Sequence, residues 1–338
     1  MKQENDFMRR KLRICFIGSG AISTSMGNVI SRKGEYEVTL LSVEPDVAKS
    51  INEEHINPKY FPNIQLHPSL TCTMDRAVLK ESDIIFFGIP SNIVVSYARE
   101  NHDLFNPEAL IVNLAKGFGA DHKTIPQGLG KILENPIHSM KGPSFAREII
   151  NNLPTGFTVM AKRDKYFKVF EEIFRDTSIY LDYSTDVNGV ELASILKNIY
   201  AIIIGIVDAH FDSPNLRSLV ITKSINEIRF IMTRFGGKEE TMFKYCGFGD
   251  FSLTALNDLS RNRTLGLLIG KGFFTSDISE KVVLEGKIAV NVFVEEIAKK
   301  RQIKTKNLML KELYKVFNEP DYDIANFVNR IIDNSSLY

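Results

Sequence analysis

The first half of the chain alternates short apolar runs with helix-length segments. The runs lack strict polar alternation, which is typical of parallel strands covered on both faces. The strands predicted in this way are Arg13–Ile17, Glu37–Leu41, Ile84–Gly88, Leu110–Leu114, Thr155–Ala161 and Ser178–Leu181. Helices predicted between them include Ala21–Arg32, Ser91–Glu100 and Asp164–Arg175. Strand and helix repeated in this order predict a doubly wound, parallel α/β sheet.

The pattern changes after about Gly189, where turn-bounded strand runs disappear. Segments with helical length and period replace them: Glu191–Asp208, Arg217–Phe235, Glu285–Arg301 and Asn307–Phe317. We therefore expect a loose polar leader over residues 1–10, an α/β domain over 11–189 and an all-helical domain over 190–338.

Composition adds limits rather than a function. With 338 residues, 44% of them hydrophobic and 25% charged, the chain has enough apolar material for two packed cores. The net charge of +1 implies no general attraction to nucleic acid or to an anionic membrane, so any phosphate site must be local. The apolar run Ile199–Val207 is too short to span a bilayer, and we expect a buried helix rather than an integral membrane segment.

The three cysteines, Cys15, Cys72 and Cys246, show no CxxC spacing. Their odd number, with no apolar secretory segment at the start, favours reduced thiols and a cytoplasmic protein. We predict no metal site.

A glycine-rich turn follows the first predicted strand directly. It reads Gly18-Ser19-Gly20-Ala21-Ile22-Ser23 and leads into a predicted helix, the context that a dinucleotide fingerprint needs. The first glycine would make the tight turn, and the second would let the backbone approach a pyrophosphate at the helix N-terminus. The alternative is a turn that only connects strand to helix. The fingerprint favours a Rossmann-type, dinucleotide-binding domain over residues 11–189.

An acidic residue, Glu44, follows the second strand. An acid there can bond ribose hydroxyls, whereas a 2′-phosphate would require a basic residue. Because no basic residue adjoins Glu44 in sequence, we expect a preference for NAD over NADP. An ordinary helix start at Glu44-Pro45-Asp46 is the alternative.

Further motifs follow in order along the chain. They are Gly88-Ile89-Pro90-Ser91, Ala115-Lys116-Gly117, Gly142-Pro143-Ser144-Phe145-Ala146, Gly189 to Asn198, Gly247-Phe248-Gly249-Asp250, Leu253-Thr254, Ser260-Arg261-Asn262-Arg263 and Leu284-Glu285-Gly286. This set, with Asn57 to Pro62, closely resembles the NAD(P)-dependent glycerol-3-phosphate dehydrogenase family from about Lys11 to Lys315. The resemblance implies a helical substrate and catalytic domain, a phosphorylated small-molecule substrate and a homodimer.

The resemblance makes Lys197 the catalytic lysine. Reduction of a ketone needs a proton for the developing alkoxide, and the reverse reaction needs a base. One lysine can do both if burial and a neighbouring positive charge, which the resemblance assigns to Lys116, lower its pKa. Lys116 would also help to polarise the carbonyl and contact the cofactor. A solvated helix lysine is the alternative, which the apolar residues around Lys197 disfavour.

The resemblance gives roles to other residues of the helical domain. Asn198 would contact the substrate or orient the lysine, and Asp250 would hold the Lys197 ammonium, with helix capping as the alternative for Asp250. Thr254, within one helical turn of Asp250, would belong to the same catalytic set. Arg261 and Asn262 would bind the substrate phosphate, against an N-capped helix start with exposed basic residues. The implied cofactor contacts are Gly18, Gly20, Ala21, Ile22, Glu44, Pro90, Lys116, Ala146, Arg261 and Glu285.

Some positions depart from the family pattern. Its Ser-Trp-Gly is Ala21-Ile22-Ser23 here, so an aromatic cofactor contact is lost and helix and strand should pack slightly less closely. Its Gly-x-Asn segment reads Asp212-Ser213-Pro214-Asn215, and its Thr-Arg-Gly reads Thr222-Lys223-Ser224. These changes reshape the rim of the expected site.

We therefore expect reversible reduction of dihydroxyacetone phosphate to sn-glycerol 3-phosphate with NAD or NADP, which would supply phospholipid synthesis. Two alternatives remain open. One is a related dehydrogenase that acts on another phosphorylated ketose or polyol, or on a 3-hydroxy acid. The other is a nucleotide-sensing protein without catalysis, which would be expected to lack Lys116, Lys197, Asp250, Arg261 and Asn262.

Overall fold

The computed structural model describes residues 11–119, 122–273, 280–299, 309–319 and 322–333, with the side chains of 280–285 left out. The expected leader over residues 1–10 lies outside the described residues. The chain divides into two compact units, residues 1–187 and 188–338.

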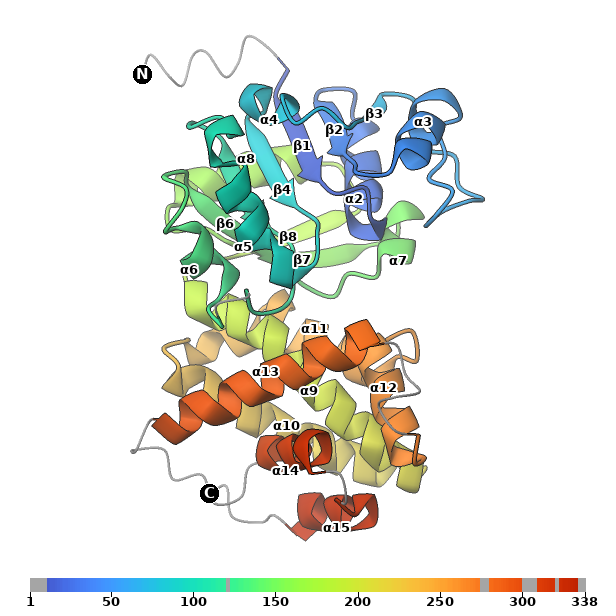
Figure 1. Ribbon diagram of the computed structural model, residues 1–338, viewed down its shortest axis with the longest axis vertical. Helices are drawn as coiled ribbons and strands as arrows, with labels where there is room; N and C mark the ends of the chain where they lie inside the picture. The colour runs from blue at the N-terminus through green and yellow to red at the C-terminus, as the bar shows by residue number, and fades with distance from the viewer. Residues whose placement is uncertain (1–10, 120–121, 274–279, 300–308, 320–321, 334–338) are drawn as a thin grey trace. The chain divides into compact units, whose positions relative to one another are not determined.

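The first unit contains an eight-stranded sheet with the order β3-β2-β1-β4-β5-β6-β7-β8. Its strands are β1 (Arg13–Ile17), β2 (Glu37–Leu41), β3 (Leu70–Thr73), β4 (Ile84–Phe87), β5 (Leu110–Asn113), β6 (Ile137–Lys141), β7 (Thr155–Met160) and β8 (Ile179–Ser184). Its helices are α2 (Ala21–Ser31), α3 (Pro45–Glu53), α4 (Val78–Glu81), α5 (Ser91–Glu100), α6 (Ile125–Leu129), α7 (Ala146–Ile150) and α8 (Asp164–Phe174). The expected doubly wound sheet is confirmed (Figure 1).

The sequence pattern predicts a fully parallel sheet, but one pair of neighbouring strands is antiparallel. β6 and β7 pair antiparallel, whereas β7 and β8 are parallel to each other. The connection between β6 and β7 holds only the five-residue helix α7. Such a helix spans about 7.5 Å, too little to return the chain along the sheet for a parallel crossover.

Each central strand contributes to two cores. In β1, Ile14 and Phe16 belong to the core that also contains residues of α2 and α8. The alternate residues Cys15 and Ile17 belong to a second core on the other face, with residues of α5 and α6. Because both faces of the sheet are covered, the residues that point to each face are apolar. The strand therefore reads as a continuous apolar run without polar alternation.

The second unit is helical, as expected. Its helices are α9 (Val187–His210), α10 (Pro214–Arg234), α11 (Asp250–Leu256), α12 (Arg261–Gly270), α13 (Glu280–Lys299), α14 (Met309–Asn318) and α15 (Ile324–Asp333). α9 extends well beyond the apolar run Ile199–Val207 and is long and apolar enough to cross a membrane. In the fold, 94% of its most apolar stretch is buried.

Candidate active site

The turn after β1 has the geometry of a dinucleotide-binding loop. Gly18 has a φ of +99°, and its N–H donates to the Leu41 carbonyl at 2.8 Å. Gly20 is the N-cap of α2 and has no side chain with which to cap the helix. A Cβ at Gly20 would meet only the Gly88 carbonyl, at 3.9 Å, so the backbone there is open to a close ligand. These features fit a pyrophosphate at the start of α2.

Ser23 occupies the third small position of the fingerprint and is fully buried. A Cβ built on Gly88, just after β4, would lie 1.9 Å from the Ser23 Oγ. The side chain that the family's glycine lacks is therefore accommodated by a glycine on the neighbouring strand.

Glu44 has a basic partner, although no basic residue adjoins it in sequence. The Lys59 ammonium donates to both Glu44 carboxylate oxygens, at 3.0 and 2.8 Å. Glu44 is the N-cap of α3, yet its side chain makes no capping hydrogen bond. The sequence argument missed Lys59 because the two residues lie on separate segments, 15 positions apart.

Other predicted cofactor contacts lie at the starts of helices in the same unit. Pro90 is the N-cap of α5, and Ala146 is the first residue of α7, which packs on α2. Ala21 and Ile22 open α2 and are half-buried, packed against the core. These two side chains contribute apolar contacts within the protein, where the family has a polar and an aromatic residue.

Lys116 follows β5 and is fixed by its neighbours. Its ammonium donates to the Gly142 carbonyl at 2.8 Å and to the Ser144 Oγ at 3.2 Å. A second lysine, Lys141 at the end of β6, donates to the carbonyl of Ala115 and is fully buried. Sequence reasoning missed Lys141. No strand was predicted at Ile137–Lys141, so nothing in the sequence indicated that this lysine ends one.

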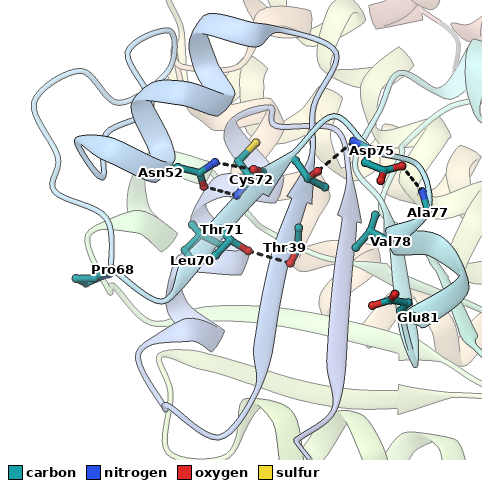
Figure 2. A pocket seen from close by; sticks show the side chains of 11 residues that line it. Thr39, Asn52, Pro68, Leu70, Thr71, Cys72, Asp75, Ala77, Val78 and Glu81 are labelled. Atoms are coloured by element: carbon teal, nitrogen blue, oxygen red, sulfur yellow. Dashed lines mark hydrogen bonds between the residues drawn. The ribbon is translucent and has the colours of Figure 1, made fainter.

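An open groove of about 580 Å³ lies at the sheet edge beside β3 (Figure 2). There the Asn52 side chain from α3 donates to the Cys72 carbonyl and accepts from the Cys72 N–H, both at 2.8 Å. This amide occupies backbone groups of an edge strand that would otherwise be open to pairing. None of the predicted site residues lines the groove.

In the second unit, Lys197 lies on α9 and is 5% exposed. Its ammonium donates to the Asp250 Oδ1 at 2.5 Å and to the Thr254 Oγ1 at 2.9 Å. The Thr254 hydroxyl donates in turn to the Asp250 carbonyl at 2.7 Å, one helical turn back. The three predicted residues therefore form one buried hydrogen-bonded cluster.

Asp250 is the first residue of α11, and its carboxylate contacts Lys197 instead of capping the helix. Asn198, next to Lys197 on α9, is half-buried. Neighbouring positions on a helix point in different directions, so Asn198 does not share the Lys197 face.

Arg261 and Asn262 are the first two residues of α12, after the N-cap Ser260. Arg261 is exposed and Asn262 half-buried, so both basic and amide donors stand at a helix N-terminus, where anions are favoured. Arg263 is not an exposed basic residue. It is 7% exposed, and its guanidinium donates to the buried Asp208 of α9.

Small residues join α12 to α9 as well. A Cβ at Gly205 would lie 2.3 Å from the Arg263 carbonyl, and one at Gly266 would lie 2.1 Å from the Ile202 carbonyl. The helix with Arg261 is therefore held against the helix with Lys197 by backbone contact and by the Asp208–Arg263 ion pair.

The other positions that the sequence singled out lie on α13 and on or next to α10. Glu285 belongs to α13, and its side chain lies outside the described residues. The departure at Asp212–Asn215 is the start of α10, with Ser213 as N-cap and Pro214 as first residue. Lys223 donates to the carbonyls of Ile331 and Ile332 in the last turn of α15.

A doubly wound sheet with this glycine turn, followed by a helical unit with a buried lysine, defines a class of NAD(P)-dependent oxidoreductases. The sequence model described as the N-terminus of NAD-dependent glycerol-3-phosphate dehydrogenase matches residues 13–167, and that of the C-terminus matches 186–328. The chain belongs to the NAD-dependent glycerol-3-phosphate dehydrogenase family.

Individual relatives and a solved structure support the same family. The chain is 33% identical to a chloroplastic NAD(+) glycerol-3-phosphate dehydrogenase of Arabidopsis thaliana, over 90% of this chain and 74% of the relative. It is 31% identical to the NAD(P)+ enzyme of Methanothermobacter thermautotrophicus, over 92% and 94%. The crystal structure of glycerol-3-phosphate dehydrogenase from Coxiella burnetii has a TM-score of 0.85 at 28% identity, covering 96% of this chain and 99% of that one.

Proposed function

We propose that this enzyme interconverts dihydroxyacetone phosphate and sn-glycerol 3-phosphate, with Lys197 as the general acid and base. The supporting observation is the buried Lys197–Asp250–Thr254 cluster in a chain of this family. Burying an ammonium is costly, because only its partners offset its desolvation. A lysine at this position therefore contributes little to stability that an apolar residue would not, which favours a chemical role.

Different side chains would transfer the proton, stabilise charge and bind the substrate. When bound, NADH or NADPH supplies the hydride for the carbonyl carbon. The Lys197 Nζ gives a proton to the developing alkoxide, and in the reverse direction takes one from the alcohol. Asp250 stabilises the charged lysine, and Thr254 orients its nitrogen. We assign Lys116 to the carbonyl oxygen and Arg261 with Asn262 to the phosphate.

The cofactor would be held mainly by residues of the first unit. Gly18 and Gly20 would admit the pyrophosphate to the start of α2, beside Ala21 and Ile22. Glu44 would bind the adenine ribose, and Pro90 and Ala146 would contact the cofactor from the starts of α5 and α7. We assign Glu285 and Arg261 to the cofactor on the family resemblance.

The test of the reaction is turnover of dihydroxyacetone phosphate by the pure protein with NADH or NADPH, followed by nicotinamide absorbance and by detection of glycerol 3-phosphate. Unphosphorylated dihydroxyacetone serves as the control and should react poorly. Absence of turnover with both cofactors would show that the substrate is another phosphorylated ketose or that the chain does not catalyse.

Arg261→Ala should lower kcat/KM for dihydroxyacetone phosphate by about 10- to 100-fold, the contribution of a hydrogen bond to a charged group. The rate with unphosphorylated dihydroxyacetone should fall less, because this substrate has no phosphate to bind and the variant then loses only the proposed cofactor contact. Arg229→Ala is a matched control, since Arg229 is an exposed residue of α10 paired with Glu239. Equal losses with both substrates would remove Arg261 from the phosphate site.

We also propose a cytoplasmic homodimer. The dimer rests on the family resemblance, and the location on the three cysteines, which are all buried and carry no disulfide. Light scattering of the pure protein tests the assembly: a mass of one chain would contradict it.

A further inference from the structure

A closed ring of hydrogen bonds links the glycine turn to the Glu44–Lys59 pair. The Ser19 and Ser42 hydroxyls lie 2.8 Å apart, and the Glu44 N–H donates to the Ser42 Oγ at 3.0 Å. From the other side, the Asn57 amide donates to the Ser19 carbonyl at 2.9 Å and accepts from the Lys59 N–H at 3.3 Å. The Lys59–Glu44 ion pair closes the ring.

The ring has a rigid base and an accessible tip. Asn57 is fully buried, and Ser19 and Ser42 are 6% and 3% exposed. The tip is open, because the side chains of Lys59 and Glu44 are 50% and 40% exposed. The base therefore fixes the backbone of both charged residues relative to the glycine turn, while solvent and ligands can reach their ends.

The two charges at the tip favour different ligands. A carboxylate at the end of the second strand accepts hydrogen bonds from ribose hydroxyls, but it repels a 2′-phosphate. An ammonium attracts a phosphate of nearly two negative charges. Val43, 80% exposed between Ser42 and Glu44, adds no charge. The hydrogen bond to Glu44 raises the pKa of Lys59, so the lysine stays charged.

We propose that Lys59 binds the 2′-phosphate of NADP and Glu44 the ribose hydroxyls of NAD, so that this ion pair sets the cofactor preference of the chain. The inference rests on the proposed function, because it requires a nicotinamide dinucleotide at the glycine turn. An exposed ion pair is weak, so a phosphate can take the lysine from Glu44 without a large penalty.

The experiment measures dissociation constants of NADH and NADPH by nicotinamide fluorescence, which needs no turnover. The variants are Lys59→Gln and Glu44→Gln. The matched control is Lys49→Gln, which removes the same charge from an exposed lysine of α3 that pairs with Glu53. Adenosine 2′,5′-bisphosphate and adenosine 5′-monophosphate, as competitors, isolate the contribution of the 2′-phosphate.

The expected effects have opposite signs. Lys59→Gln should weaken NADPH binding about tenfold, the contribution of one charge-assisted hydrogen bond, and NADH binding by less than about twofold. Glu44→Gln should tighten NADPH binding and weaken NADH binding, and Lys49→Gln should move neither. Equal shifts for both cofactors in Lys59→Gln, or none, would overturn the inference. If the wild-type protein bound neither cofactor, the proposed function itself would fail.

Discussion

The buried cluster around Lys197 is the residue-scale feature on which the proposed chemistry depends. An ammonium removed from water needs both a counter-charge and well-placed acceptors, and Asp250 and Thr254 supply them from successive turns of α11. Because Thr254 is also bonded to the Asp250 carbonyl, its hydroxyl has a defined direction. The lysine nitrogen is therefore held in one place before substrate arrives.

Replacing the Thr254 hydroxyl tests that orientation. Thr254→Val keeps the shape but removes the acceptor, and kcat should fall about tenfold, as expected for one lost hydrogen bond to a charged group. Thr254→Ser keeps the hydroxyl and should stay close to wild type. Steady-state rates at saturating substrate provide the measurement, and a valine variant as fast as the serine variant would remove Thr254 from the site.

At this scale the sequence predicted the identities of residues better than their partners. Lys197, Asp250 and Thr254 were all predicted in the catalytic set, with Asp250 on the lysine, and in the structure both residues contact the Lys197 ammonium. The Lys59–Glu44 and Arg263–Asp208 contacts were not predicted, because neither the local pattern nor the family resemblance pairs these residues. Local pattern has no information on such pairs, since an exposed and a buried arginine look alike in sequence.

At the scale of elements, the contact between α2 and β4 decides how tightly the glycine turn is held. Gly88→Ala would place a Cβ against the buried Ser23 Oγ and should lower the free energy of unfolding by about 2 kcal/mol, a usual cost of overpacking. Adding Ser23→Gly should restore part of this loss, although glycine in a helix itself costs about 1 kcal/mol. Urea unfolding of the two single variants and the double variant measures the coupling. Strictly additive losses would contradict the contact.

The first backbone N–H groups of helix α14 are hydrogen-bonded to a buried carboxylate from another helix. Glu227 of α10 accepts hydrogen bonds from the backbone N–H groups of Met309 and Leu310 and from the Tyr200 hydroxyl, at 2.7 to 2.9 Å. Burial raises the pKa of Glu227 to about 7, against the hydrogen bonds from Leu310, Tyr200 and Met309, which lower it.

This pKa predicts a pH dependence of stability. Because the folded state holds the Glu227 proton up to about pH 7 and the unfolded state releases it near 4.5, stability falls as pH rises through this window. The contribution is about 3 kcal/mol. Glu227→Gln should remove it, so the variant should gain stability relative to wild type between pH 5 and pH 8. Parallel urea-unfolding curves for the two proteins over that range would contradict the assignment.

Strands and helices with a strong apolar period were predicted from the sequence, whereas strands that mix polar and apolar residues were not. β1, β2, α5 and α8 match their predicted positions within one residue. β3 was missed because it is a short edge strand, Leu-Thr-Cys-Thr, and β6 because Ile-His-Ser-Met-Lys places polar residues inside a buried strand. The antiparallel pairing of β6 with β7 depends on the length of the connection, which apolar pattern does not report.

On the scale of the whole molecule, the two units have separate tasks. The first provides the glycine turn, Glu44 and Lys116, and the second the Lys197 cluster with Arg261 beside it on a helix packed against α9. Fold class and order of the units follow from pattern alone. The reaction does not, because no single motif defines it; the family membership and the buried cluster together support it.

The most direct test of the account is the turnover of Lys197→Met with dihydroxyacetone phosphate and the preferred cofactor. Methionine fills similar space without a proton to give, so kcat should fall about 1000-fold, within the usual range for general acid–base catalysis. Cofactor affinity should stay within about twofold. Lys271→Met, at an exposed lysine just after α12, should match wild type. A Lys197→Met enzyme with kcat within about tenfold of wild type would contradict the central claim.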